Sequence, residues 1–165
     1  MDKTPTIFIS YNPKSEEEQT LAVRLHSIGA VSGFKVFLPD RYNSDKSLDF
    51  ETKNRIDESD FFIIFPTMSL SKIVQEEIDY AFKRFKDKSK ILVIDDQLRG
   101  IKIKKSHLFT KISFNSETES IDEATRKVLE IIKSIESSKS TVNGFLALLG
   151  IGLGLFILSE IFKEK

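Results

Sequence analysis

The stretch that decides the fold is Phe-Phe-Ile-Ile-Phe at residues 61–65, which Pro66 follows directly. An uninterrupted apolar run of this length, ended by proline, is typical of a strand that is buried on both faces of a sheet. Strands of this kind belong to parallel sheets with helices packed on both sides. The run therefore predicts an α/β domain with residues 61–65 near the centre of its sheet.

Four more short β-type runs surround this strand, and helical periodicity fills the intervals between the five. The other predicted strands are TIFIS at 6–10, FKVFL at 34–38, ILVI at 91–94 and KISF at 111–114. The predicted helices cover residues 16–28, 48–58, 71–86 and 121–135. Alternating strands and helices with right-handed crossovers predict a flavodoxin-like, doubly wound sheet of five parallel strands in the order 2-1-3-4-5.

Individual residues suggest where the helices begin and which way they face. Gly29 is interpreted as the C-terminal stop of the first helix, and Ser71 as the cap of the third. In the second helix, Phe50 and Ile56 are expected to point inward. The pair Asp95-Asp96 follows the fourth predicted strand and is interpreted as an exposed turn.

The composition narrows the functional classes. The chain has 165 residues with 25 basic and 25 acidic side chains, no cysteine and two histidines. The balanced charge argues against a broadly basic nucleic-acid binder, so no nucleic-acid partner is expected. The lack of cysteine and the scarcity of histidine argue against a thiolate or multi-histidine metal centre, so no metal site is expected. Catalysis, if present, would depend on a carboxylate.

The C-terminal part of the chain has a different character. The twenty residues between Lys139 and Glu160 include no charged side chain. Residues 142–162 would form a helix about 31 Å long at about 1.5 Å per residue, which matches a bilayer core of about 30 Å. Gly150 and Gly154 form a GxxxG pattern, which lets two membrane helices approach closely. A hydrophobic helix buried inside an oligomer is the alternative.

These observations divide the chain into four parts. The first residues do not resemble a signal peptide, so we expect the folded domain to face the cytoplasm, with a single-pass C-terminal anchor in the membrane. The expected parts are an α/β domain at residues 1–133, a polar linker at 134–141, a transmembrane helix at 142–162 and a charged tail at 163–165.

Ligands of doubly wound sheets bind beyond the carboxyl ends of the strands. The segments expected at that edge are residues 11–15, 39–47, 66–71 and 95–99. Glu77 belongs to the helix that starts near this edge, three residues after Val74 and one before Ile78, beside the apolar face. A partly desolvated carboxylate there could bind sugar hydroxyls and stabilise positive charge on a ribose. The alternative is that Glu77 is solvated next to Glu76.

Four segments, taken in order, resemble a known family. They are IFISY at residues 7–11, GFKVFL at 33–38, IDESDFFIIF at 56–65 and SKIVQEEI at 71–78. The last is similar to the helix start S-K-W-x-x-x-E-[IL] of Toll/interleukin-1 receptor (TIR) domains, with Ile73 in place of tryptophan. The resemblance extends over about residues 5–133 and is closest to bacterial TIR domains.

This resemblance implies an activity and its residues. Many TIR domains cleave NAD at the nicotinamide–ribose bond, by hydrolysis or cyclisation, and the family's catalytic glutamate corresponds to Glu77. NAD would be the substrate, and no further cofactor is implied. Glu76 is a competing candidate, although one residue along a helix rotates the side chain by about 100°. The residues expected to line the pocket are Ser10, Tyr11, Asn12, Phe37, Asp40 and Ser71.

The resemblance also implies how the protein assembles and what role it has in the cell. Such NADases act on self-assembly, here through the TIR domain and the membrane helix, as bacterial antiphage or immune effectors, and a separately encoded sensor protein could trigger them. Ile73 and the Asn12-Pro13 pair depart from the family pattern. A non-enzymatic TIR adaptor that acts by TIR–TIR contact at the membrane therefore stays open, as does another flavodoxin-like protein that processes nucleotides or nucleosides.

Overall fold

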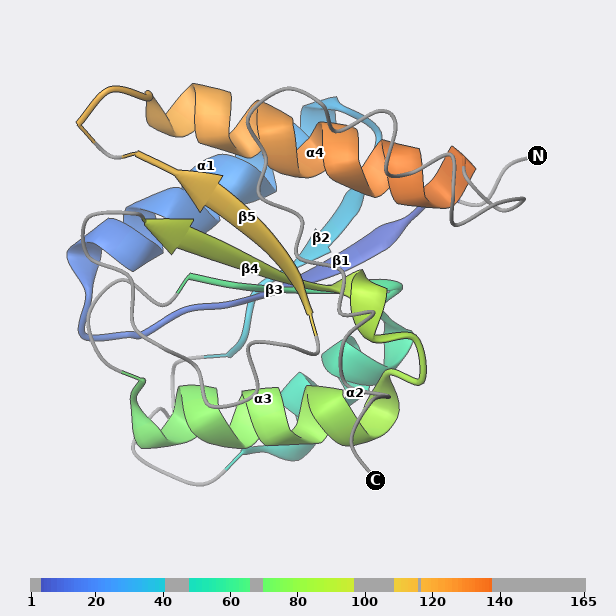
Figure 1. The fold of residues 1–165 in the computed structure, drawn as a ribbon. Coiled ribbons are helices and arrows are strands. Elements are labelled where there is room, and N and C mark those ends of the chain that lie inside the picture. Colours follow the sequence, from blue (N-terminus) through green and yellow to red (C-terminus); the bar gives the residue numbers. More distant parts are fainter. Residues whose placement is uncertain (1–3, 41–47, 66–69, 97–108, 116, 138–165) are drawn as a thin grey trace, which may run out of the picture.

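The computed structural model describes residues 4–40, 48–65, 70–96, 109–115 and 117–137. Its five strands pair in parallel in the order β2-β1-β3-β4-β5, which confirms the predicted sheet (Figure 1). The strands are β1 Thr6–Ser10, β2 Lys35–Phe37, β3 Phe61–Ile64, β4 Ile91–Asp96 and β5 Thr110–Phe114.

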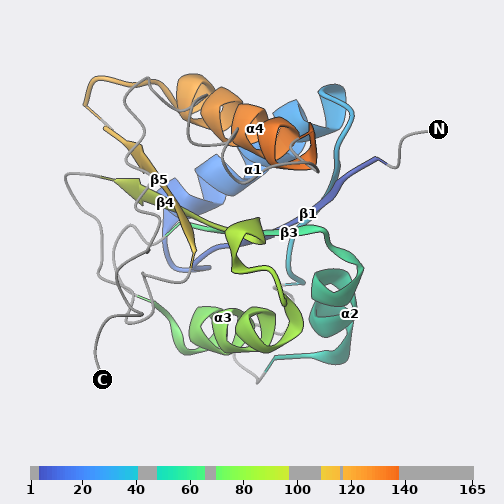
Figure 2. The same ribbon diagram turned by 45° about the vertical axis from the view of Figure 1, so that its right-hand side comes forward.

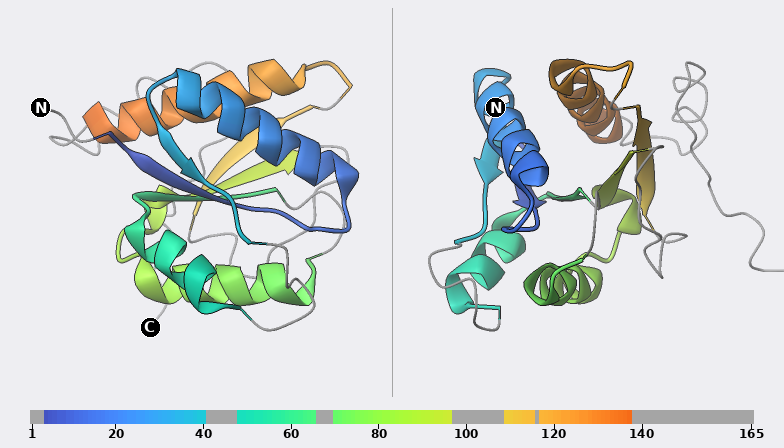
Figure 3. Two further views of the ribbon diagram at one scale, coloured as in Figure 1. Left: turned by 180° about the vertical axis from the view of Figure 1, so that it is seen from behind. Right: turned by 90° about the vertical axis from the view of Figure 1, so that its left-hand side faces the viewer.

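Helices cover both faces of this sheet. They are α1 Glu16–Val31, α2 Phe50–Glu58, α3 Lys72–Arg84 and α4 Ile121–Ser137, with a short 3-10 turn, η1, at Lys88–Lys90. Helices α1 and α4 pack side by side on one face, and α2 and α3 pack together on the other (Figures 1 and 2). The views in Figure 3 show the sheet between these two helical layers. This is the doubly wound arrangement that the sequence predicts.

Strand β3 lies between β1 and β4, and all four of its residues are buried. Alternate residues point to opposite faces. Phe61 and Ile63 join the apolar cluster under α1 and α4, whereas Phe62 and Ile64 join the cluster under α2 and α3. On the second face, the ring of Phe62 stacks on Phe8 of β1 at a centroid distance of 5.5 Å. The central run thus contributes to both halves of the core.

Helix α1 does not end where the sequence suggested. It continues through Gly29 to Val31, and Gly33, with a φ of +83°, lies in the turn that follows. Gly29 is buried against β2, where an added Cβ would lie 2.8 Å from Cγ2 of Val36. The interpretation of Gly29 as a stop was therefore wrong, because this glycine permits close packing of α1 on β2.

The expected direction of Phe50 was also wrong. Phe50 is 78% exposed, whereas Ile56 is buried as predicted. The carboxylate of Asp49 accepts a hydrogen bond from the backbone N–H of Thr52 at 2.6 Å and so fixes the start of α2. With that start, Thr52 and Ile56 face the core one turn apart. Phe50 lies about 200° around the helix from Thr52 and points to solvent.

The C-terminal expectations are only partly covered by the structure. Helix α4 runs to Ser137, so residues 134–137 are helical although they were predicted to belong to the linker. Within the described ranges, no helix is both long and apolar enough to cross a membrane. The expected membrane helix at residues 142–162 lies outside those ranges.

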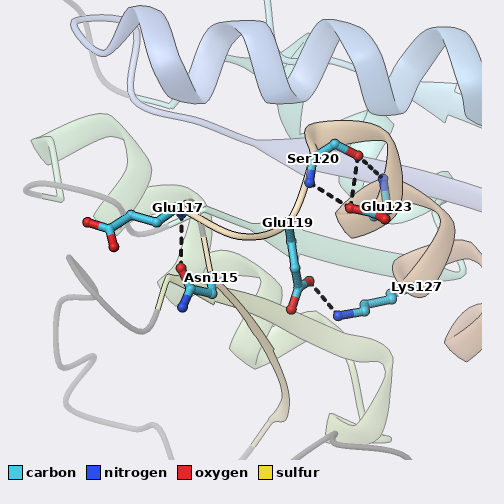
Figure 4. A network of polar contacts seen from close by, with 6 residues as sticks. All are labelled: Asn115, Glu117, Glu119, Ser120, Glu123 and Lys127. Atoms are coloured by element: carbon cyan, nitrogen blue, oxygen red, sulfur yellow. Dashed lines mark hydrogen bonds and ion pairs between the residues drawn. The ribbon is translucent and has the colours of Figure 1, made fainter.

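A reciprocal cap fixes the start of α4 (Figure 4). The Ser120 hydroxyl accepts from the backbone N–H of Glu123 at 3.2 Å, and the Glu123 carboxylate accepts from the backbone N–H of Ser120 at 2.7 Å. This is the capping box of the pattern S-x-x-E. The hydrogen bond from the Ser120 N–H lowers the pKa of Glu123 below its ordinary value. Lys127, one turn further along α4, forms an ion pair with Glu119.

We expect Glu123→Gln to be less stable than the wild type at pH 7. A carboxyl group whose pKa is lowered by folding stabilises the folded state above its unfolded pKa, here near 4.5, and loses that contribution as the pH falls through the folded pKa. The stability difference between wild type and Glu123→Gln should therefore shrink below about pH 5. Urea titrations of the full chain from pH 7 to pH 3 measure it. Asp122→Asn is the matched control, because it removes the charge of the neighbouring carboxylate. Equal losses of stability in the two variants at pH 7 would contradict the role of Glu123 in the cap.

Candidate functional site

Glu77 occupies a position that an apolar residue would normally fill. Ser71 caps α3, and its hydroxyl accepts from the backbone N–H of Val74 at 3.4 Å. From this start, the buried residues of the helix are Val74, Glu77, Ile78, Ala81 and Phe82. The spacing is that of a single apolar stripe, with the carboxylate of Glu77 inside it at 0% exposure. The alternative of a solvated Glu77 is wrong.

The buried carboxylate is hydrogen-bonded to the sheet. Ser10 is the last residue of β1 and faces α3, as Phe8 does, because residues two apart share one face. Its hydroxyl Oγ donates a hydrogen bond to Oε2 of Glu77 at 2.5 Å. A buried carboxyl group is costly unless it is hydrogen-bonded, and the Ser10 hydroxyl supplies one of the hydrogen bonds of Glu77. The structure thus joins two of the predicted site residues at the carboxyl end of β1.

Two further predicted residues lie in the turn that follows β1. Tyr11 and Asn12 are both buried. The turn closes through the backbone N–H of Ser15, which donates to the carbonyl oxygen of Asn12 at 3.0 Å. The side-chain oxygen of Asn12 also accepts from the backbone N–H of Lys14 at 3.0 Å. This segment is therefore well anchored directly beside the Ser10–Glu77 pair.

One carboxylate that contacts this turn was not predicted from the sequence. Glu18 of α1 is only 2% exposed, and its Oε2 accepts from the backbone N–H of Asn12 at 2.5 Å. The pattern S-x-x-E, formed by Ser15 and Glu18, was the available signal, because it is typical of a helix start. That signal would have indicated a cap but not a contact with the turn after β1.

Glu76, the competing candidate, makes different contacts from its neighbour. Its Oε2 accepts from the backbone N–H of Leu48, just before α2, at 2.8 Å. Its other oxygen lies 3.9 Å from the ammonium nitrogen of Lys72. Glu76 is only partly buried and so keeps contact with solvent. Of the two adjacent glutamates, Glu77 alone is hydrogen-bonded to β1 within the described residues.

The remaining predicted site residues are more dispersed. Phe37 packs on the cluster under α2 and α3 and is the register partner of Phe8. Ser71 lies six residues before Glu77, about 9 Å along the helix axis at about 1.5 Å per residue, and its hydroxyl caps the helix. Asp40 is half-buried at the end of a described range, and residues 41–47 lie outside the described residues.

The end of β4 differs from the expected exposed turn. Asp95 and Asp96 are both strand residues, paired with Ser113 and Phe114 of β5. Asp96 is 1% exposed, and Asp95 forms an ion pair with Lys111. The turn interpretation was wrong because β5 extends alongside both aspartates. Within the ranges that the structure covers, no group of three or more His, Asp or Glu side chains is placed to hold a metal ion.

The comparisons with known proteins concern the fold. No family model matches the chain, and no curated protein matches it significantly in sequence. Among solved structures, the chain is similar to the CMP N-glycosidase BcmB of Clostridium botulinum, with 19% sequence identity and a TM-score of 0.52. The match covers 74% of this chain and 97% of that chain. At this identity the likeness supports a common fold.

We expect Ser10→Ala to lower the free energy of unfolding by about 1–3 kcal/mol, because it leaves a buried carboxylate without this donor. The double variant Ser10→Ala/Glu77→Leu should be more stable than Ser10→Ala, because it removes the buried carboxylate together with its Ser10 donor. Urea titrations of the full chain measure both. A double variant less stable than Ser10→Ala alone would contradict this account of the buried pair.

Proposed function

We propose that this chain is a glycohydrolase that cleaves the N-glycosidic bond of a nucleotide, with Glu77 as its catalytic residue. The observation that carries the proposal is the fully buried carboxylate of Glu77, held by Ser10 at the carboxyl end of β1. This is the edge at which doubly wound sheets bind ligands. The likeness of the fold to a CMP N-glycosidase gives further support to this class of reaction.

The chemistry suits a single buried carboxylate. Cleavage of an N-glycosidic bond develops positive charge on the ribose, and a desolvated carboxylate stabilises that charge more strongly than water does. In the proposed reaction, the bond between C1′ and the base nitrogen breaks and the base takes the bonding electrons. Water then adds its oxygen to C1′ and releases a proton. Glu77 would bind the ribose hydroxyls and face the developing charge.

We propose NAD as the substrate, on the basis of the TIR-like segments. The segment SKIVQEEI resembles the helix start that carries the catalytic glutamate of TIR domains, and by that resemblance the glutamate corresponds to Glu77. In the structure, Glu77 of α3 is hydrogen-bonded to Ser10 of β1. Cleavage of NAD also requires few catalytic groups at the site. Its nicotinamide nitrogen is positively charged while bonded to ribose and leaves as a neutral base, so no proton donor is needed. Tyr11, Asn12, Phe37 and Asp40 are the proposed neighbours of the substrate.

We expect the clustered full-length protein to release nicotinamide from NAD, and Glu77→Gln to lower kcat by at least a hundredfold. The amide keeps the size of the side chain but removes the charge that faces the ribose. Glu76→Gln tests the competing glutamate, and Asp79→Asn is a control on the exposed side of the same helix. Both controls should stay within about threefold of the wild type. Chromatographic detection of nicotinamide measures the rates.

The outcomes separate the hypotheses. Release of cytosine from CMP, without release of nicotinamide from NAD, would keep the glycohydrolase but replace the substrate. Equal activity of Glu77→Gln and the wild type would exclude Glu77 as the catalytic residue. If concentrated wild-type protein releases neither base, the enzyme proposal fails and the TIR adaptor becomes the better hypothesis.

We further propose that the protein is a bacterial antiphage or immune effector held at the membrane by residues 142–162. This proposal depends on the uncharged stretch of the sequence and on the TIR resemblance. Confinement to a membrane raises the effective concentration of the domains, so that weak lateral contacts can assemble them. The trigger could then be a separately encoded sensor that acts on the cytoplasmic domain.

Replacing both Gly150 and Gly154 with Leu should lower the NADase activity in vesicles at least fivefold, because close approach of two membrane helices requires small residues. Urea unfolding of the domain should remain unchanged. Alkaline extraction of membranes tests the anchor itself, and recovery of the protein in the soluble fraction would contradict it. Equal activity of wild type and variant would exclude pairing through these glycines.

A further inference from the structure

Two helices of this fold begin with the same sequence pattern but use it differently. Ser15 and Glu18 start α1, and Ser120 and Glu123 start α4. In both, the serine hydroxyl accepts from the backbone N–H of the glutamate at 3.2 Å. At α4 the glutamate carboxylate returns to the backbone N–H of its own serine and completes the capping box (Figure 4).

At α1 the carboxylate makes another bond. The backbone N–H of Ser15 donates instead to the carbonyl oxygen of Asn12, and Oε2 of Glu18 accepts from the backbone N–H of Asn12. Glu18 is 2% exposed, whereas Glu123 is exposed. Burial of a charge has a substantial cost, which the helix N-terminus offsets only in part. A carboxylate is therefore kept inside the protein and is bonded to the turn before the helix rather than to the N–H of its own serine.

The N–H that Glu18 binds belongs to the turn that leaves the candidate site. Asn12 lies two residues after Ser10, and the hydroxyl of Ser10 donates to Glu77. A shift of the peptide before Asn12 changes the path of the chain out of β1. The direction of the Ser10 hydroxyl depends on that path. The buried bond of Glu18 thus fixes the chain on one side of Ser10, and the β-sheet fixes it on the other.

We propose that Glu18 is a positioning residue for the reaction at Glu77: it holds the turn after β1 so that the Ser10 hydroxyl stays directed at the catalytic carboxylate. This inference rests on the proposed glycohydrolase function for its kinetic consequences. Its structural part, the coupling of Glu18 to Ser10, is independent of catalysis. In this proposal Glu18 acts through the main chain of the turn.

The kinetic test compares Glu18→Gln with Glu123→Gln in the full-length protein. Glu18→Gln keeps the side-chain volume and an acceptor oxygen but loses the charge, and charge-assisted hydrogen bonds are about twice as strong as neutral ones. We expect kcat for NAD cleavage to fall about tenfold in Glu18→Gln and to stay within twofold in Glu123→Gln. Glu123→Gln is the matched control because it removes the same residue of the same pattern from a helix that does not contact Ser10 or Glu77 through that residue.

Introducing Glu18→Gln into the Ser10→Ala variant separates a positioning role from general destabilisation. In Ser10→Ala, Glu18→Gln should cause no further loss of kcat, because the group that Glu18 positions is gone. A tenfold loss in both backgrounds would overturn the proposal, since Glu18 would then act independently of Ser10. An unchanged kcat in the Glu18→Gln single variant would overturn it as well.

A third measurement does not need activity and so distinguishes the two proposals. Hydrogen exchange of the Asn12 amide should be at least tenfold faster in Glu18→Gln than in the wild type or in Glu123→Gln. The effects of Glu18→Gln and Ser10→Ala on the unfolding equilibrium constant should be sub-additive by threefold or more. Additive effects would overturn the coupling even in an active enzyme. If the effects of the two substitutions are sub-additive but the wild-type protein releases no base, the coupling stands and the proposed function is rejected.

Discussion

Burial of β3 on both faces is the constraint on which the rest of this structure depends. A strand with no solvent-exposed face needs a helical layer on each side, and β3 also has a paired strand on each edge. Phe62 and Phe61 meet these two layers from adjacent positions. Parallel pairing then brings the carboxyl ends of the strands to one edge, where α1, α3 and α4 begin. The neighbourhood of Ser10 and Glu77 is a consequence of this arrangement.

The candidate site departs from the rules that stabilise the rest of the domain. Glu77 stands in the apolar stripe of α3, where a leucine would pack without a desolvation cost. Glu18 is a second buried carboxylate, held by a main-chain N–H of the adjoining turn. Departures of this kind are expected where a protein gives up stability for function. Of the three buried carboxylates in the described residues, Asp96 ends β4, whereas Glu77 and Glu18 contact the end of β1 and the turn after it. The second and third of these are the physical basis for placing the chemistry at β1.

The sequence predicted the helices and strands well. The predictions for individual residues failed where one residue type can serve two structural roles. The apolar run of β3, the serine cap of α3 and the strand order were all confirmed. Gly29 was interpreted as a helix end, but it lies inside α1 and permits close packing against Val36. Phe50 resembled a core residue, yet the cap at Asp49 sets the helix so that this side chain faces solvent. In each case the deciding contact involves a residue or a helix start that periodicity does not specify.

By itself, the sequence determined the α/β class, the order of the strands and the presence of a glutamate next to an apolar helical face. These properties follow from hydrophobic periodicity and from chain connectivity, which are local or nearly so. Only the tertiary structure decided that Glu77 rather than Glu76 meets β1, and that Glu18 holds the turn after it. Ser10 and Glu77 are separated by 67 residues, and a hydrogen bond over that distance forms only once sheet and helix have packed. The direction of a buried side chain depends on that packing, which no short segment contains.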